Sequence, residues 1–366
     1  MTDRKIEEFA EVLVEKSADI QEGENVYLLA KSLDSLPLFE EVRRQIISKG
    51  AFPHEHLLYD SQVGSEGMDY DWIKHASKEQ LETVSEVKKK EMKNMDAYIR
   101  IGGADNTQEL SGLDSEKISA RQEATKEIFY ERDKKKWVTT RWPTDGLAQS
   151  SGMPTQELRE YIFDAVTEAD YKEIKERNSR IKKKFDEAGE IRIKSERTDL
   201  KLSIEGRKGV NCHGVRNIPD GEVFYAPRKK SVNGEIKFAF PGVSSGNQAR
   251  GIWLKFQDGE VVDYSAEINE KFLEDMINTD EGSKYIGELG IGTNPQMDRF
   301  IGNALLDEKI YGTVHLALGR AYERSLPEGE SGNDSGIHWD LVEDLRDGGK
   351  ILLDGEVVQE DGEWKF

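Results

Sequence analysis

The pattern of the chain changes near Ala188, and this change constrains the fold more than any other feature. Before Ala188, short apolar runs alternate with segments of helical spacing, which indicates crossover units and a mostly parallel sheet covered on both faces. After it, short strands follow one another with turn residues between them, as in an antiparallel sheet or barrel. The sequence therefore predicts an α/β N-terminal domain, residues 1–188, and a β-rich α+β C-terminal domain, residues 189–366.

The first half is expected to open with a helix that has Phe9, Val12 and Leu13 on one face. Apolar periodicity predicts helices at about Ile6–Ser17, Leu36–Ile47, Gln156–Thr167 and Tyr171–Glu187, and strands at Val26–Ala30, His56–Tyr59, Ala97–Ile101 and Lys136–Thr140.

The second half is expected to contain short strands with Asn-Gly and Asp-Gly turns between them. Strands are predicted at Glu190–Lys194, Leu200–Ile204, Glu222–Ala226, Ile236–Phe240 and Gly251–Phe256, with turns at Pro219-Asp-Gly, Asn233-Gly and Asp258-Gly, a helix from Asn269, and a final hairpin from Leu353 to Phe366.

The charge and composition exclude several classes of partner. A net charge of −20 argues against binding to nucleic acid or to an anionic membrane, since both carry the same sign. No apolar run approaches the ~18 residues of a membrane span, and the opening segment lacks the apolar stretch of a signal peptide. The single cysteine, Cys212, rules out an internal disulfide and fits a reducing interior, so we expect a cytoplasmic protein. The spread of acidic residues indicates a solvated surface or adaptation to a salty cytosol.

Histidines and carboxylates gather in the second half of a chain that has only six histidines. Imidazoles and carboxylates with almost no thiol are the ligands of a catalytic divalent-metal site rather than a structural one. His338 and Asp340 are two residues apart, so on a strand both side chains point to one face. The full set is Glu222, Glu288, Glu308, His315, His338 and Asp340. Two imidazoles and four carboxylates are enough for two metal ions that share bridging carboxylates.

Four segments, in this order, carry a resemblance to a known family: GEVFYAP, GELGIGTNP, LLDEKIYGTVHLALGRAY and the HWD near the end. KWVTTRWPTD and IRIGGADNTQELSG of the first half match more weakly. The ordered set resembles the thermophilic metallo-aminopeptidase family of the aminopeptidase T type, in its archaeal-like branch. The resemblance spans nearly the whole chain. It implies the same two-domain fold and a homodimer whose active sites open into an enclosed space.

The resemblance also implies roles for individual residues. It makes Glu222, Glu288, Glu308, His315, His338 and Asp340 the metal ligands, and Glu288 and Tyr322 the catalytic pair. The stretch from Glu308 to His315 is two residues longer than in bacterial members, and this difference bears most on Glu308. The loop between Tyr322 and His338 is short, which bears on the rim of the substrate site.

The function that the resemblance implies is removal of the N-terminal residue from short peptides with a free N-terminus. A metal-activated water, deprotonated by Glu288 or a neighbouring carboxylate, would attack the first peptide carbonyl. Tyr322 would donate a hydrogen bond to the oxyanion. It follows His315 by seven residues, so both could face one pocket if this segment is helical. A metal-dependent amidase acting on a non-peptide substrate and an inactive metal-binding scaffold are the alternatives. The ions could be zinc, cobalt, manganese or magnesium.

Two further groups invite a functional interpretation. His54 and His56 share a face if they lie on a strand, a geometry that suits a metal, but no carboxylate cluster accompanies them. Histidines on a strand edge are the simpler interpretation. Cys212 and His213 suggest a nucleophile and its base, but adjacent strand residues point to opposite faces, so we expect a structural role.

Overall fold

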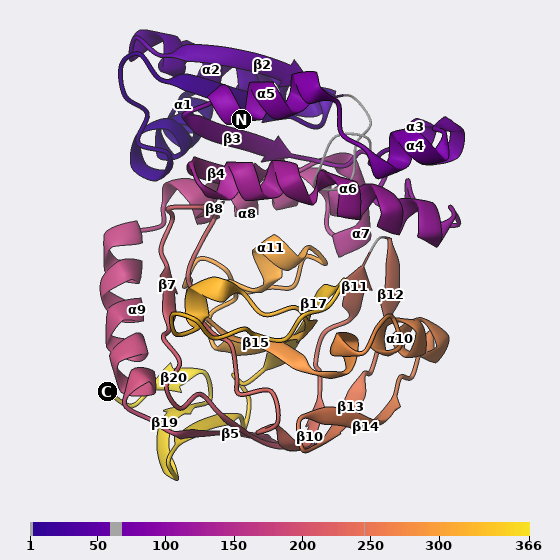
Figure 1. Ribbon diagram of the computed structural model, residues 1–366. Coiled ribbons are helices and arrows are strands. Elements are labelled where there is room, and N and C mark those ends of the chain that lie inside the picture. Colours follow the sequence, from indigo (N-terminus) through magenta and orange to yellow (C-terminus); the bar gives the residue numbers. More distant parts are fainter. Residues whose placement is uncertain (1–2, 59–67, 245) are drawn as a thin grey trace. The chain divides into compact units, whose positions relative to one another are not determined.

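The computed structural model describes residues 3–58, 68–244 and 246–366, and the chain divides into two compact units. The first unit contains Met1–Ala169 and Gly214–Pro219, and the second contains Asp170–His213 and Asp220–Phe366. Figure 1 follows the chain through the elements of each unit. Among the described residues, no helix has both the length and the apolar character that a membrane crossing requires.

The first unit is built on a five-stranded sheet in which every pair of neighbours is parallel, in the order β2-β1-β3-β4-β8. Its strands are β1 (Asn25–Ala30), β2 (Phe52–Leu57), β3 (Ala97–Gly102), β4 (Lys136–Arg141) and β8 (Asn217–Ile218). Its helices are α1 (Asp3–Glu11), α2 (Leu36–Ser48), α3 (Tyr70–His75), α4 (Lys78–Glu82), α5 (Glu86–Asn94), α6 (Ser115–Asp133), α7 (Asp145–Ser151) and α8 (Thr155–Thr167), with the short turns η1 (Val12–Ser17) and η2 (Leu33–Ser35). The predicted parallel α/β architecture is confirmed.

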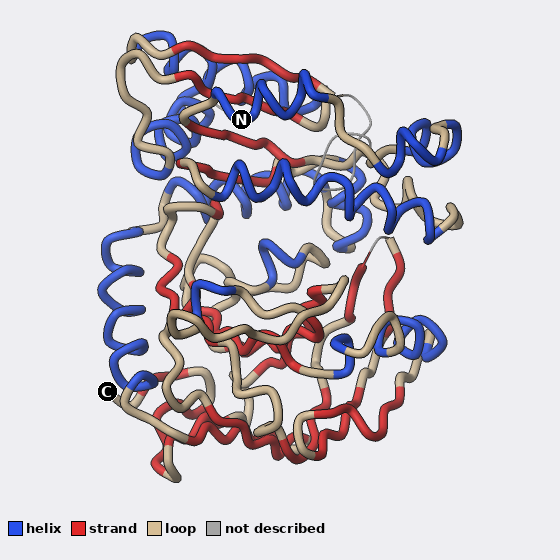
Figure 2. Tube along the Cα trace, viewed as in Figure 1, coloured by secondary structure: helices blue, strands red, loops and turns tan. Residues whose placement is uncertain are grey.

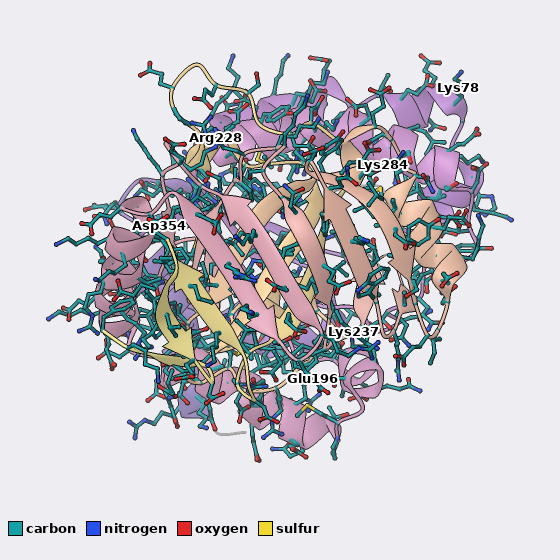
Figure 3. All side chains as sticks on the ribbon, turned by 90° about the horizontal axis from the view of Figure 1, so that it is seen from below. Lys78, Glu196, Arg228, Lys237, Lys284 and Asp354 are labelled. Atoms are coloured by element: carbon teal, nitrogen blue, oxygen red, sulfur yellow. The ribbon has the colours of Figure 1, made fainter. Side chains whose placement is uncertain are left out.

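The second unit contains two larger antiparallel sheets that share one apolar core. The eight-stranded sheet has the order β14 (Glu260–Ser265), β13 (Trp253–Gln257), β10 (Asn233–Lys237), β6 (Thr198–Ser203), β5 (Glu190–Ser195), β18 (Lys350–Leu353), β19 (Glu356–Glu360) and β20 (Glu363–Trp364). The five-stranded sheet has the order β17 (His338–Asp344), β16 (Thr313–Gly319), β15 (Ile286–Gly292), β9 (Glu222–Tyr225) and β7 (Val210–Cys212). Figure 2 shows how strands dominate this unit, and Figure 3 looks onto the eight-stranded sheet.

Smaller elements complete the second unit. They are the helices α9 (Tyr171–Asp186), α10 (Glu270–Ile277) and α11 (Ala304–Asp307), the short turns η3 (Gly282–Lys284) and η4 (Glu323–Ser325), and the strand pair β11 (Gly242–Ser244) and β12 (Asn247–Ala249). The predicted β-rich C-terminal region is confirmed. Helix α9, which we expected at the end of the first half, makes its contacts within the second unit, where Asn178 donates hydrogen bonds to the carbonyls of Cys212 and Glu222. The division into domains 1–188 and 189–366 stays a prediction.

Some predicted elements differ from the structure for local reasons. Strand β2 lies earlier than predicted, and Tyr59 falls outside the described residues. Asn233-Gly234 is not a turn, because both residues lie in β10. Gly234 is needed there since a Cβ would come within 2.1 Å of the carbonyl oxygen of Asp199. Asp258-Gly259, by contrast, turns between β13 and β14 with both φ angles positive, as predicted.

Helix α6 was not predicted, although it is 19 residues long. Its buried residues include Arg121 and Thr125, so its inward face lacks the apolar period by which the other helices were found. Its start is fixed by Asp114, whose carboxylate accepts hydrogen bonds from the backbone N–H groups of Glu116 and Lys117. The capping residue was the available signal.

Glu343 of β17 gives a test of the core. Its side chain is buried and accepts a hydrogen bond from Ser195 Oγ at 2.8 Å, and burial raises its pKa to about 7. The folded chain thus binds this proton more tightly than the unfolded chain. The free energy of unfolding therefore falls as pH rises from the ordinary glutamate pKa of ~4.3 to about 7. Above that pH, Glu343 causes no further loss of stability.

We expect Glu343→Gln to stabilise the protein at pH 8 by up to roughly 3 kcal/mol and to have little effect at pH 4.5, since glutamine carries no charge to bury. Thermal unfolding at both pH values measures this, with the exposed Glu356→Gln as control. A shift in Tm that is the same at both pH values would contradict the assignment.

Candidate metal centre

One face of the five-stranded sheet carries the predicted ligands. Residues paired across neighbouring strands point to the same face, and every second residue along a strand does so too. His315 pairs with Gly290 on one side and with Val342 on the other, and Asp340 pairs with Ala317. The same register places these residues on the same face: Glu222, Glu288, His315, His338 and Asp340. His338 and Asp340 lie on one strand, as predicted.

The opposite face of this sheet is apolar and belongs to the core. Val223, Leu289, Leu316 and Leu341 alternate with the ligand-type residues along β9, β15, β16 and β17, and all four are buried in the core cluster of this unit. Packing of the apolar side chains in the core thus fixes the register of each strand. In this register the alternating polar side chains lie on the face that carries the ligands.

Gly290 makes room for the imidazole of His315. A Cβ at Gly290 would lie 2.0 Å from both Cε1 and Nε2 of His315. The GELGIG motif therefore supplies a carboxylate at Glu288 and, two residues later, the space that the histidine ring occupies.

The first group of donors consists of Glu222, Glu288 and His315, all buried. His315 Nε2 lies 3.4 Å from Glu222 Oε2 and 3.3 Å from Glu288 Oε1. All three residues offer a donor atom within 4.8 Å of the other two.

The second group consists of Glu288, His338 and Asp340. His338 Nδ1 donates a hydrogen bond to the carbonyl oxygen of Arg320 at 2.7 Å, which leaves Nε2 with its lone pair directed away from the backbone. Nε2 lies 3.5 Å from Asp340 Oδ1. Glu288 belongs to both groups, so it is the carboxylate best placed to lie between two cations.

Glu308 lies outside both groups, at the C-terminal end of α11. Its Oε2 accepts a hydrogen bond from Lys309 Nζ at 2.8 Å, and the same ammonium lies 2.7 Å from Glu222 Oε1. Lys309 is fully buried and was missed by the sequence interpretation. The available signal was its position directly after Glu308, within a segment that the family motif already singled out.

Tyr322 lies beside the second group, although not for the reason expected. The segment after His315 is strand β16, not a helix, so the argument from two helical turns was wrong. A strand is favoured here because Val314, Leu316 and Leu318 alternate into the core. The chain leaves the strand at Gly319, and the Tyr322 ring then packs 4.6 Å from that of His338.

The donors fit divalent cations. Glu222 Oε2 and Glu288 Oε2 are buried and have no hydrogen-bond partner among the described residues. Buried polar atoms almost always have a partner, and a cation is a partner that fits these two carboxylate oxygens. Carboxylate oxygen together with imidazole nitrogen suits zinc, cobalt and manganese, and the carboxylates also suit magnesium.

Protons partly neutralise this cluster. Burial raises the pKa of Glu288, and it raises that of Glu308 to about 8. Burial lowers the pKa of His315, but its hydrogen bond with Glu288 and the charge of Glu222 outweigh this and raise the pKa to about 9. Burial disfavours the Asp340 carboxylate, but the neighbouring His338 draws its pKa below the ordinary value. A cation that binds here must displace protons, so its binding strengthens as pH rises.

The other two candidate pairs have structural partners. His54 and His56 share one face of β2, but Nε2 of His54 bonds to Asn25 Oδ1 at 3.0 Å and Nε2 of His56 to Glu91 at 2.8 Å. His213 Nδ1 bonds to the carbonyl oxygen of Asn211 at 3.1 Å. Burial raises the pKa of Cys212 well above its ordinary value, so this thiol stays neutral.

Comparison with known proteins agrees with this geometry. The chain is 26% identical to aminopeptidase 2 of Geobacillus stearothermophilus over 416 aligned positions, covering 100% of this chain and 98% of that one. It is 27% identical to aminopeptidase AmpS of Bacillus subtilis, covering 99% of both. Among solved structures, wild-type AmpT from Thermus thermophilus has the same fold, with a TM-score of 0.84, 22% identity and 99% of both chains covered.

The family model of the thermophilic metalloproteases (M29) matches residues 2–364. A metalloprotease hydrolyses peptide bonds with the help of a bound metal, so the predicted metal-dependent hydrolase with peptide substrates is confirmed. The full-length match also confirms the resemblance that the GEVFYAP and GELGIGTNP motifs indicated. The chain therefore belongs to the thermophilic metalloprotease (M29) family.

Proposed function

We propose that this protein is an aminopeptidase that removes the N-terminal residue of short peptides, with two divalent ions bound at the two overlapping donor groups. The observation that carries the proposal is the position of Glu288 in both groups, next to Glu222 and His315 on one side and to His338 and Asp340 on the other. Both relatives that align with nearly the whole chain are named aminopeptidases, which supports the specificity for N-terminal residues.

The proposed ligands are Glu222, Glu288, Glu308, His315, His338 and Asp340. Glu308 belongs to neither of the two donor groups, and it would join them through Oε1, the oxygen that Lys309 does not contact. When bound, the ions would supply a water of lowered pKa and would polarise the peptide carbonyl.

Glu288 would act as general base. It would bind the ions through Oε1, which faces His315, and accept the proton through Oε2, which has no hydrogen-bond partner in the described part of the chain. Tyr322 would donate a hydrogen bond to the developing oxyanion. It is 37% exposed and packs on His338, a position from which its side chain can meet a substrate entering from solvent. A carboxylate of the cluster would hold the free α-amine of the peptide.

We also propose that the protein is a cytoplasmic homodimer. The single cysteine supports a reducing compartment, and the family resemblance supports the dimer. Light scattering would report twice the mass of the chain.

The proposed activity predicts a dependence on metal and on a free amine. Protein stripped with a chelator should not hydrolyse leucine p-nitroanilide or Leu-Gly-Gly, and activity should return when cobalt, zinc, manganese or magnesium is added in turn. N-acetylated Leu-Gly-Gly should not be cleaved, since it lacks the amine. Cleavage of the acetylated peptide at a similar rate would instead indicate an amidase, and binding of metal without any turnover would indicate an inactive scaffold.

Glu288→Gln tests the general base. The substitution keeps the shape of the side chain but removes its basic oxygen, so we expect kcat to fall at least ~100-fold. The thermal unfolding curve should show a folded protein, and the exposed Glu356→Gln should keep the activity of the parent chain. A Glu288→Gln variant with near-full kcat would rule out the role.

Gly290→Ala tests the space around His315. The added methyl group would overlap the imidazole, so the ring must move and we expect metal affinity to fall at least ~10-fold. Gly189→Ala is the matched control, because there the nearest atom to a new Cβ is 3.7 Å away. Calorimetric titration with zinc measures the affinity. An affinity equal to that of the control would show that His315 does not contribute a ligand in the position described.

A further inference from the structure

Lys309 is a cation built into the metal centre. Its side chain is fully buried, and its ammonium lies 2.7 Å from Glu222 Oε1 and 2.8 Å from Glu308 Oε2. A buried ammonium is costly unless carboxylates compensate it, and here two do so. The contacts tie the end of α11 to the start of β9 within the second unit.

These contacts determine how Glu222 can bind a cation. A free carboxylate can bind an ion through one oxygen or through both. In Glu222, Oε1 is held by Lys309, while Oε2 lies 3.4 Å from His315 Nε2 and has no hydrogen-bond partner in the described residues. Glu222 therefore presents one oxygen to the first donor group.

Lys309 also makes the two donor groups electrostatically unequal. The first group, Glu222, Glu288 and His315, has a fixed positive charge directly bonded to one of its ligands. Lys309 reaches the second group only through Glu308, which is not one of its three members, and among the described residues no lysine or arginine forms an ion pair with Glu288 or Asp340. A cation bound in the first group would thus be repelled by Lys309 at short range inside a buried site, where screening is weak.

We propose that Lys309 is a positioning residue that holds Glu222 as a one-oxygen ligand and makes the ion at Glu222, Glu288 and His315 the more weakly bound of the two. This inference rests on the two-ion centre of the proposed function. The second group would then hold its ion while the ion of the first group exchanges. The charge of Lys309 would also balance the single negative charge that remains when four carboxylates and one hydroxide are set against two divalent ions.

Three substitutions separate the charge of Lys309 from its hydrogen bonds. Lys309→Arg keeps both, Lys309→Gln keeps a hydrogen-bond donor without the charge, and Lys309→Met removes both. Lys31→Met is the matched control, since Lys31 is a buried lysine of the first unit and no proposed ligand lies in that unit. Circular dichroism and thermal unfolding establish which variants are folded.

The experiment is a calorimetric titration of each chelator-stripped, full-length variant with Co²⁺. The parent chain and Lys31→Met should show two binding steps of unequal affinity. In Lys309→Met and Lys309→Gln the weaker step should tighten at least ~10-fold, because the variants remove a positive charge that repels the cation inside a buried site, and the tighter step should stay within ~3-fold. Lys309→Arg should stay within ~3-fold of the parent in both steps. If Lys309→Met does not fold, Lys309→Gln and Lys309→Arg carry the comparison.

The visible absorption of bound Co²⁺ gives a second measurement, since its intensity falls as the coordination number rises. Lys309→Met frees Glu222 Oε1. The absorption of the more weakly bound ion, at Glu222, Glu288 and His315, should therefore weaken. Unchanged dissociation constants in Lys309→Gln, or equal effects on both steps, would overturn the inference. Neither measurement uses a peptide, so two-step binding without peptidase activity would overturn only the proposed function. A parent chain that binds a single ion would overturn the inference.

Discussion

Side chains alternate between the two faces of the five-stranded sheet, and the metal centre depends on this alternation. Leu289, Leu316 and Leu341 bury one face in the core, and the residues between them carry the carboxylates and imidazoles of the other. A slip of one residue in any of these strands would move its ligand into the core and a leucine into the site. The apolar core therefore sets the geometry of the polar cluster. Of the proposed site residues, only Glu308 and Tyr322 lie outside the strands of this sheet.

The same arrangement lowers the stability of the folded chain, because it buries several ionisable groups together. Glu222, Glu288 and His315 are buried together, and burying charge without a partner costs several kcal/mol per group. The chain offsets this cost with the ammonium of Lys309 and with raised pKa values of Glu288 and Glu308, which keep protons in the site. Bound cations would replace those protons. Binding and folding are thus coupled through one set of oxygens.

Much of the fold was predictable from periodicity, and each miss has its own cause. Every predicted strand overlaps a strand of the structure, but β14, β15 and β16 were not predicted. Helix α6 was missed because its buried face includes Arg121 and Thr125, and Asn233-Gly234 was misread because glycine serves close packing as well as turns. The helix expected between His315 and Tyr322 failed because spacing alone does not separate a two-turn helix from a strand and a loop.

The sequence by itself determined the family, the two kinds of domain and the candidate ligands, because ordered motifs and residue types are local properties of a chain. Only the tertiary structure decided that Glu288 is shared by two donor groups, that Gly290 accommodates His315, and that Lys309 binds two of the carboxylates. These relations join β9, β15, β16, β17 and α11, segments far apart along the chain. Strand register and the packing of a buried charge bring them together. Neither can be predicted from the spacing of residues within any single motif.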